Sequence, residues 1–103
     1  MRFDVFTILP DVMQGYLQAS ILGKAQDSGH LDVAVHDIRI YTTDRHRTTD
    51  DEPYGGGGGM IMKPEPIFAA VEEVLGEELK SVPIVLLTPQ GRLFDPVSYT
   101  HLR

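Results

Sequence analysis

Cysteine is absent from this chain of 103 residues, and so is any long apolar run. Without cysteine, disulfide bonds and thiolate metal sites are excluded. No apolar run approaches the roughly 20 residues of a membrane-spanning helix. The opening Met-Arg-Phe-Asp also lacks the apolar core of a signal peptide. We therefore expect a cytoplasmic protein with no membrane partner.

Positive charge is also scarce, with 9 Lys and Arg against 15 Asp and Glu and a net charge of −6. Contacts to phosphates need Lys or Arg, so this balance argues against a broadly basic nucleic-acid binder. Four acids gather in one predicted helix: Glu72, Glu73, Glu77 and Glu78. Four basic residues fall within one short stretch: Arg39, Arg45, His46 and Arg47. That stretch is either a local basic patch on an acidic domain or a solvated loop of alternating charge.

The length suits one domain with a core of modest size. Residues 3–9 are rich in Val, Ile and Phe and stop at Pro10, which predicts a buried strand. A helix follows, because Met13, Tyr16 and Leu17 recur at the spacing of one helical face. The chain therefore begins with a strand that leads directly into a helix.

A second helix and a second strand are expected next. Ser20 predicts the cap of a helix that runs through Ala25 and ends near Gly29. Residues 31–36 alternate between apolar and polar side chains, and the apolar positions continue to Ile40. This alternation predicts a strand with one more exposed face.

Neither periodicity is visible in residues 41–63, which we expect to form a long loop that is either functional or disordered. The helical period returns at Pro64, and Pro66 suits a position in the first turn. The apolar face of this helix is Ile67, Ala70, Val71, Val74 and Leu75. Gly76 interrupts the helix without necessarily ending it. Residues 83–87 are apolar on both faces, as in a central parallel strand.

Strands that alternate with helices indicate right-handed crossovers and a parallel sheet. We therefore expect an α/β fold. Only three strands are predicted, which is few for a sheet that is covered on both faces. In such sheets ligands bind outside the carboxyl ends of the strands. Residues 88–91 follow the last predicted strand at that place, and they form either a ligand site or an ordinary tight turn.

Five consecutive glycines, at positions 55–59, follow a run whose charge changes from basic to acidic. Glycine loses more conformational entropy on folding than any other residue, so this run needs a reason. One reason is close approach of a ligand or another chain, and the alternative is a flexible linker. The run is not a dinucleotide-binding fingerprint, because Met60 stands where the last glycine would fall. It is not a phosphate-binding P-loop either, because no Gly-Lys-Ser/Thr follows.

Three pairs of residues carry side chains that can ligate metals. They are His36 with Asp37, Asp44 with His46, and Asp50 with Asp51. Their spacing matches no known ligand geometry, so we expect no metal bound by protein side chains. His46 is better suited to stacking on RNA or donating a hydrogen bond to it.

Residues 44–60 (DRHRTTDDEPYGGGGGM) closely resemble the loop of bacterial tRNA (guanine-N1)-methyltransferases, which belong to the knotted SPOUT superfamily. Two further segments match this family, residues 3–10 (FDVFTILP) and 87–92 (LTPQGR). The resemblance extends in register over residues 1–95. It implies a Rossmann-like SPOUT half-domain of an enzyme that methylates N1 of the guanosine 3′ of the tRNA anticodon. The implied methyl donor is S-adenosylmethionine.

The resemblance also implies roles for individual residues. Leu86 and Leu87 would line the adenine side of the donor pocket, and backbone contacts would come from Thr88, Pro89, Gln90 and Gly91. The residues implied near the tRNA are Arg45, His46, Asp50, Tyr54, Gly55, Gly56, Gly57 and Gly59. Asp50 can accept hydrogen bonds from the N1–H and exocyclic amine of a guanine. Family members commonly carry proline or alanine where this chain has Gly58, a difference that should loosen the loop without removing a contact.

Several family features are expected outside the residues matched here. They are the trefoil knot after the last matched segment, most of the donor pocket, and the carboxylate that acts as general base. The resemblance also implies a homodimer with the active site between subunits, and magnesium is a family expectation. Residues 96–103 do not resemble the family, so we expect a non-family tail and a truncated, inactive chain, with ordinary divergence as the alternative for the tail. The competing interpretations are a non-catalytic RNA- or nucleotide-binding module and a gene fragment without function.

Overall fold

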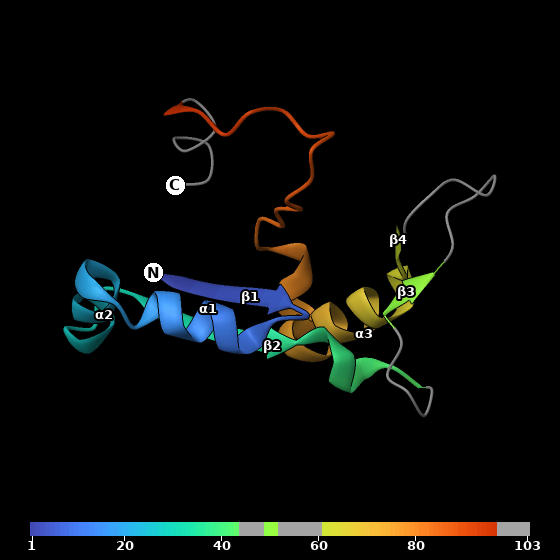
Figure 1. The fold of residues 1–103 in the computed structure, drawn as a ribbon, viewed down its shortest axis with the longest axis horizontal. Helices are drawn as coiled ribbons and strands as arrows, with labels where there is room; N and C mark the ends of the chain where they lie inside the picture. The colour runs from blue at the N-terminus through green and yellow to red at the C-terminus, as the bar shows by residue number, and fades with distance from the viewer. Residues whose placement is uncertain (44–48, 52–60, 97–103) are drawn as a thin grey trace.

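Two parallel strands form the centre of the fold in the computed structural model, which describes residues 1–43, 49–51 and 61–96 (Figure 1). Strand β1 (Arg2–Thr7) pairs with β2 (Asp32–Asp37), in a register that sets Arg2 opposite Asp32 and Thr7 opposite Asp37. Helices α1 (Pro10–Leu17) and α2 (Ser20–Asp27) make the crossover between them. The predicted α/β fold with a parallel sheet is confirmed.

The second half of the described chain begins with the 3₁₀ helix η1 (Ile38–Tyr41). Two short strands follow, β3 (Asp50–Asp51) and β4 (Ile61–Met62), and they pair antiparallel. Helix α3 (Pro64–Leu75) and the 3₁₀ helix η2 (Gly76–Lys80) complete the body. Helix α3 packs on η1 and β1, while α1 packs on β2.

The core lies where α3 meets η1. Ile38 of η1 is 3% exposed and Ala70 of α3 is fully buried. Pro66 is buried in the first turn of α3. Backbone N–H groups in the first turn have no partner within the helix, so proline, which lacks this group, is tolerated there. Most other apolar side chains of the sheet and helices are only half-buried. The described part of the chain therefore has a thin core.

The corner between α1 and α2 is held by one glutamine. The side-chain amide of Gln26 donates to the carbonyl oxygen of Leu17 at 2.6 Å and to that of Leu22 at 3.3 Å. The predicted cap at Ser20 is wrong, because Ala19 is the cap and Ser20 is the first helical residue, with φ of +50°. The predicted end near Gly29 is confirmed, since α2 stops at Asp27 and Gly29 has φ of +81°.

The second strand ends earlier than the alternation predicts. The Asp37 carboxylate accepts a hydrogen bond at 2.9 Å from the backbone N–H of Arg39. This bond caps η1 and turns the chain out of the sheet, so Ile38 and Ile40 leave the strand direction. Ile38 enters the core as a result, while Ile40 remains 59% exposed.

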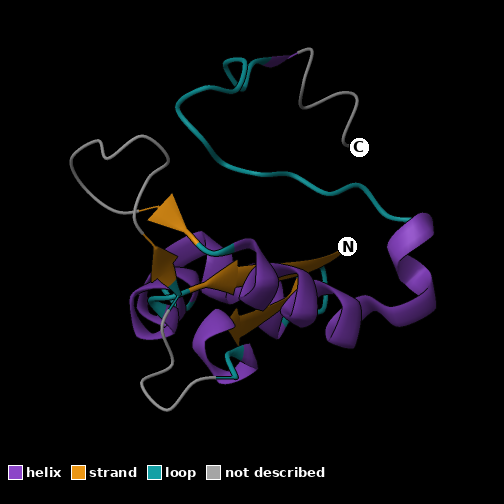
Figure 2. Ribbon diagram, turned by 90° about the vertical axis from the view of Figure 1, so that its right-hand side faces the viewer, coloured by secondary structure: helices purple, strands orange, loops and turns teal. Residues whose placement is uncertain are grey.

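The predicted strand over residues 83–87 does not form. These residues have no strand partner in the described part of the chain, and they follow η2 as an exposed, irregular segment. Figure 2 shows this segment as a teal trace that runs apart from the strands and helices of the body. Its side chains are 53–89% exposed from Ile84 to Leu87. A strand needs a neighbour to satisfy its backbone groups, and β1 and β2 pair only with each other here.

Two other expectations need refinement. The α-helical part of the third helix ends at Leu75, and Gly76, with φ of +53°, starts the 3₁₀ turn η2 rather than continuing the α-helix. The long loop predicted over residues 41–63 contains the β3–β4 pair, with β3 near its middle and β4 near its end. The N–H of Lys63 also donates to the carbonyl of Thr49 at 2.6 Å. The two ends of the glycine-rich stretch are therefore joined at its base.

Candidate functional site

Residues 88–91 form a hydrogen-bonded turn. The N–H of Gly91 donates to the carbonyl of Thr88 at 3.1 Å, and the N–H of Gln90 donates to the Thr88 hydroxyl at 3.3 Å. A Cβ at position 91 would lie 3.4 Å from the Thr88 carbonyl oxygen, which is ordinary contact. The turn itself would therefore accept a small side chain at position 91. A strict need for glycine there would have to come from a ligand or another segment that approaches the backbone.

Leu86 and Leu87 precede this turn and present apolar surface to solvent. Their exposed fractions are 75% and 89%. Apolar side chains beside a turn with polar groups suit one wall of a pocket for a flat, partly apolar ligand. The described chain supplies no facing wall. A depression lies between α1 and α2, and none of the residues that line it is a predicted site residue: Gln18, Gly23, Gln26 and Asp27.

Asp50 lies in β3 and is half-buried. Asp50 is opposite Met62 of β4, so the pairing of these two short strands fixes the position of the Asp50 Cα atom. The other residues predicted near the tRNA lie outside the described residues: Arg45, His46, Tyr54, Gly55, Gly56, Gly57 and Gly59. In the described part of the chain, no hydrogen bond or ion pair joins Asp50 to residues 86–91. The structure thus describes the base of the loop and the exposed segment at residues 86–91, and no contact between the two is present in the described part of the chain.

His36 and Asp37 do not act as a pair. The His36 ring contacts Asp4 of β1, whereas the Asp37 carboxylate caps η1. Asp44 and His46 lie outside the described residues. Among residues 1–43, 49–51 and 61–96, no three His, Asp or Glu side chains are grouped as a metal site would require.

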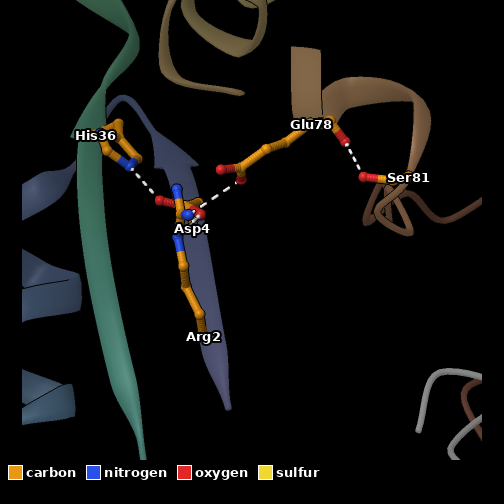
Figure 3. A network of polar contacts seen from close by, with 5 residues as sticks. All are labelled: Arg2, Asp4, His36, Glu78 and Ser81. Atoms are coloured by element: carbon orange, nitrogen blue, oxygen red, sulfur yellow. Dashed lines mark hydrogen bonds and ion pairs between the residues drawn. The ribbon is translucent and has the colours of Figure 1, made fainter. Parts of the chain in front are cut away.

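A cluster of polar contacts on β1 was not anticipated from the sequence (Figure 3). The Asp4 carboxylate contacts His36 at 2.9 Å and Arg2 at 3.0 Å, and Arg2 also reaches Glu78 of η2 at 3.1 Å. The pKa of the Arg2 guanidinium is raised above its ordinary value. The main cause is the negative charge and hydrogen bond of Asp4, and the charge of Glu78 adds to it. The signal in the sequence is that Arg2 and Asp4 share one strand face. The partner His36 could be found only from the register of the parallel pair.

The fold defines a class of protein: an α/β domain with a parallel strand pair, in which an exposed turn at residues 88–91 follows η2. Residues 1–103 match the family model described as tRNA (Guanine-1)-methyltransferase TrmD. The chain belongs to this family, as its motifs predicted. In the described residues, no helix has the length and apolar character needed to span a membrane.

Curated relatives support the same placement. The tRNA (guanine-N(1)-)-methyltransferase of Thermomicrobium roseum is 56% identical over 94 residues, which is 91% of this chain and 35% of that protein. The enzyme of the same name from Chloroflexus aggregans is 53% identical over 95 residues, covering 92% of this chain and 37% of that protein. The chain thus spans little more than a third of the length of these relatives.

A solved structure gives the corresponding result for the fold. The crystal structure of tRNA (m1G37) methyltransferase from Aquifex aeolicus matches with a TM-score of 0.69 and 36% identity. The match covers 78% of this chain and 36% of that one. The family model extends to Arg103, whereas the relatives cited match over 94 and 95 residues, so the boundary predicted after Asp95 stays a prediction.

Proposed function

We propose that this chain is the N-terminal part of a tRNA (guanine-N1)-methyltransferase that uses S-adenosylmethionine and modifies the guanosine 3′ of the anticodon. The observation that carries the proposal is the identity of 56% with a named relative across 91% of the chain. The structural likeness to the Aquifex aeolicus enzyme supports it independently of the loop motif. The complete enzyme would be a cytoplasmic homodimer with its active site between subunits.

The turn at Thr88–Gly91 would hold the methyl donor. S-Adenosylmethionine would supply a methyl group on a sulfonium, and the exposed side chains of Leu86 and Leu87 suit its adenine face. Residues 88–91 are exposed, so a ligand can approach this backbone, where the N–H groups of Gln90 and Gly91 already donate to Thr88. These residues would bind and orient the donor. The described residues offer no cluster for magnesium, so no role for that ion follows from them.

Asp50 would recognise a guanine. A carboxylate accepts hydrogen bonds only, and the Watson–Crick edge of guanine presents two adjacent donors, the N1–H and the exocyclic amine. Sequence-specific recognition of RNA uses that edge in unpaired loops such as an anticodon loop. The β3–β4 ladder and the bond between Lys63 and Thr49 would hold Asp50 at the base of the glycine-rich stretch.

Two substitutions in a longer protein carrying this sequence test the division of roles. Asp50→Ala removes a charge-assisted hydrogen bond, which is worth about 1.5–3 kcal/mol. We expect kcat/KM for tRNA to fall roughly tenfold to a hundredfold, with KM for the donor nearly unchanged. Gly91→Val places a branched side chain where the donor would approach the backbone, and should raise KM for the donor first.

Asp27→Ala is the matched control, because Asp27 is an exposed acid at the end of α2 and contacts neither site in the described part of the chain. Steady-state kinetics with tRNA and donor varied separately gives the readout. An unchanged kcat/KM for tRNA in Asp50→Ala would end the recognition role. An effect of Asp27→Ala as large as that of Asp50→Ala would show that charge alone is responsible.

The 103-residue chain alone should transfer no methyl group. The donor segment supplies a single exposed wall, so neither the orientation of the donor nor proton removal from the guanine is provided for. The measurement is methyl incorporation into undermethylated tRNA, with a no-enzyme control. Turnover clearly above that control would contradict the expectation. Tight tRNA binding without turnover would favour a non-catalytic RNA-binding module.

A further inference from the structure

Asp4 is a nearly buried carboxylate with a partner on each oxygen. Its side chain is 11% exposed, with Oδ2 at 3.0 Å from Arg2 Nε and Oδ1 at 2.9 Å from His36 Nε2. An ionised carboxylate only accepts hydrogen bonds, so both nitrogens donate to it. Burying a charge is unfavourable unless it is paired, and these two contacts supply the pairing.

The sheet fixes the position of Asp4 and of its histidine partner. Phe6 is opposite His36 in the parallel register, and their rings stack with centroids 4.9 Å apart and planes 27° apart. The His36 side chain is 21% exposed, so packing as well as the hydrogen bond limits its movement. Asp4 is therefore held at a defined point on the face of β1 and β2.

Arg2 connects this fixed point to the end of η2. Its Nε contacts Asp4, and its Nη1 donates to Glu78 Oε2 at 3.1 Å. The carbonyl oxygen of Glu78 accepts from the backbone N–H of Ser81 at 2.9 Å and from the Ser81 hydroxyl at 3.0 Å. Figure 3 shows the contacts in line, from His36 on β2 through Asp4 and Arg2 to Glu78 and Ser81.

Ser81 caps η2, and the exposed segment that leads to the turn at Thr88 begins one residue later. The line of contacts thus joins the first strand to the point where that segment leaves the body. We propose that Asp4 is a positioning residue. Through Arg2 and Glu78 it fixes the end of η2, and so sets where residues 82–91 begin. The effect of this positioning by Asp4 on donor binding rests on the proposed function of residues 86–91.

The expected effect is small, because the weakest contact in the line is exposed. The side chains of Arg2 and Glu78 are 48% and 56% exposed. Exposed ion pairs change an equilibrium by between about 1.4-fold and fivefold, and salt screens them. The contact between Asp4 and His36 is more buried and is less sensitive to salt. The line should therefore weaken with salt at its Glu78 end first.

Glu78→Gln in the 103-residue chain is the direct test, with Glu77→Gln as the matched control. Both substitutions remove one negative charge from η2, but Glu77 has no part in the line. We expect amide hydrogen exchange at Ser81 to rise about threefold in Glu78→Gln and to stay unchanged in Glu77→Gln. High salt should raise exchange in the wild type and have little further effect in Glu78→Gln.

Asp4→Asn should have the same effect on Ser81, because the guanidinium loses its charged acceptor. If that variant does not fold, Arg2→Lys serves instead, since an ammonium keeps the charge but cannot bridge both carboxylates as the guanidinium does. Equal exchange at Ser81 in Glu78→Gln and Glu77→Gln, or no response to Arg2→Lys, would overturn the positioning role.

A second measurement separates this inference from the proposed function. In a longer protein carrying this sequence, Glu78→Gln should raise KM for S-adenosylmethionine about twofold to fivefold and leave KM for tRNA unchanged. An increase confirms that the positioning reaches the donor site. An unchanged KM alongside faster Ser81 exchange would count against donor binding by residues 86–91, while the fixing of η2 by Asp4 would stand.

Discussion

Thr49 is 1% exposed, and its hydroxyl oxygen has no hydrogen-bond partner in the described part of the chain. An unpaired buried hydroxyl is unfavourable, by about 1–3 kcal/mol in protein substitutions. Thr49→Val keeps the branched shape and removes the hydroxyl. We expect it to stabilise the chain by about 1 kcal/mol, which for a domain of this size raises Tm by about 4–8 °C. Thermal unfolding followed by circular dichroism is the measurement.

Thr42→Val provides the contrast for that prediction. The Thr42 hydroxyl donates to the carbonyl of Arg39 at 2.9 Å, so its removal leaves a hydrogen bond unmade. We expect this variant to lose about 0.5–1.5 kcal/mol of stability. If Thr49→Val also lowers Tm, its hydroxyl must have a partner in solution.

The sequence alone could not predict the hydrogen-bond partner of His36. The sequence places His36 next to Asp37, and that adjacency suggested a possible ligand pair. Neighbours along a strand point to opposite faces, so Asp4, on the paired strand, is the residue that His36 can reach. That contact depends on the register between β1 and β2, which a single sequence leaves open.

At the scale of elements, two helical glycines, Gly15 and Gly23, differ in the space that is available for a side chain. A Cβ on Gly23 would lie 2.4 Å from the backbone carbonyl oxygen of Gln18, so the α1–α2 corner would have to move. We expect Gly23→Ala to destabilise the chain by about 1–3 kcal/mol, as overpacking does. Chemical denaturation with a constant m-value is the measurement.

Gly15→Ala is the control for Gly23→Ala. Nothing lies within 4 Å of a Cβ at Gly15, which is inside α1. Alanine there should stabilise the helix by about 0.5–1 kcal/mol. Loss of stability in both variants would mean that the corner does not have the close contact described for Gly23.

The elements differ in how well local pattern predicts them. The apolar periodicity of α3 holds in the structure, because a helix satisfies its own backbone hydrogen bonds. Residues 83–87 have an equally clear strand pattern but form no strand, because a strand depends on a neighbour. Ile38 and Ile40 left the second strand because Asp37 caps η1, a local bond that alternation does not reveal.

For the molecule as a whole, the family and the α/β fold could be predicted from three sequence segments, and both are confirmed. The geometry of the site could not. Most residues expected near the tRNA lie outside the described residues, and the segment expected to bind the donor, residues 86–91, is exposed. The relatives are nearly three times as long as the matched region. A pocket between segments distant in sequence cannot be derived from a third of such a protein.

The exposed segment has a consequence for the solution behaviour of the 103-residue chain. Ile84, Val85, Leu86 and Leu87 are 53–89% exposed, carry no charge and have a strand-forming composition. An exposed apolar segment with unpaired backbone groups promotes association between chains. We expect self-association that increases with concentration, measurable by sedimentation velocity, despite the net charge of −6.

Val85→Lys should reduce that association, because it places a charge in the centre of the exposed run. Val12→Lys on α1 is the matched control: Val12 is 66% exposed, Val85 is 53% exposed, and both substitutions change the net charge equally. If association depended only on net charge, the two variants would behave alike. If it depends on strand pairing by residues 84–87, only Val85→Lys should shift the sedimentation profile towards the monomer. Equal profiles for the two variants would therefore exclude this segment as the site of association.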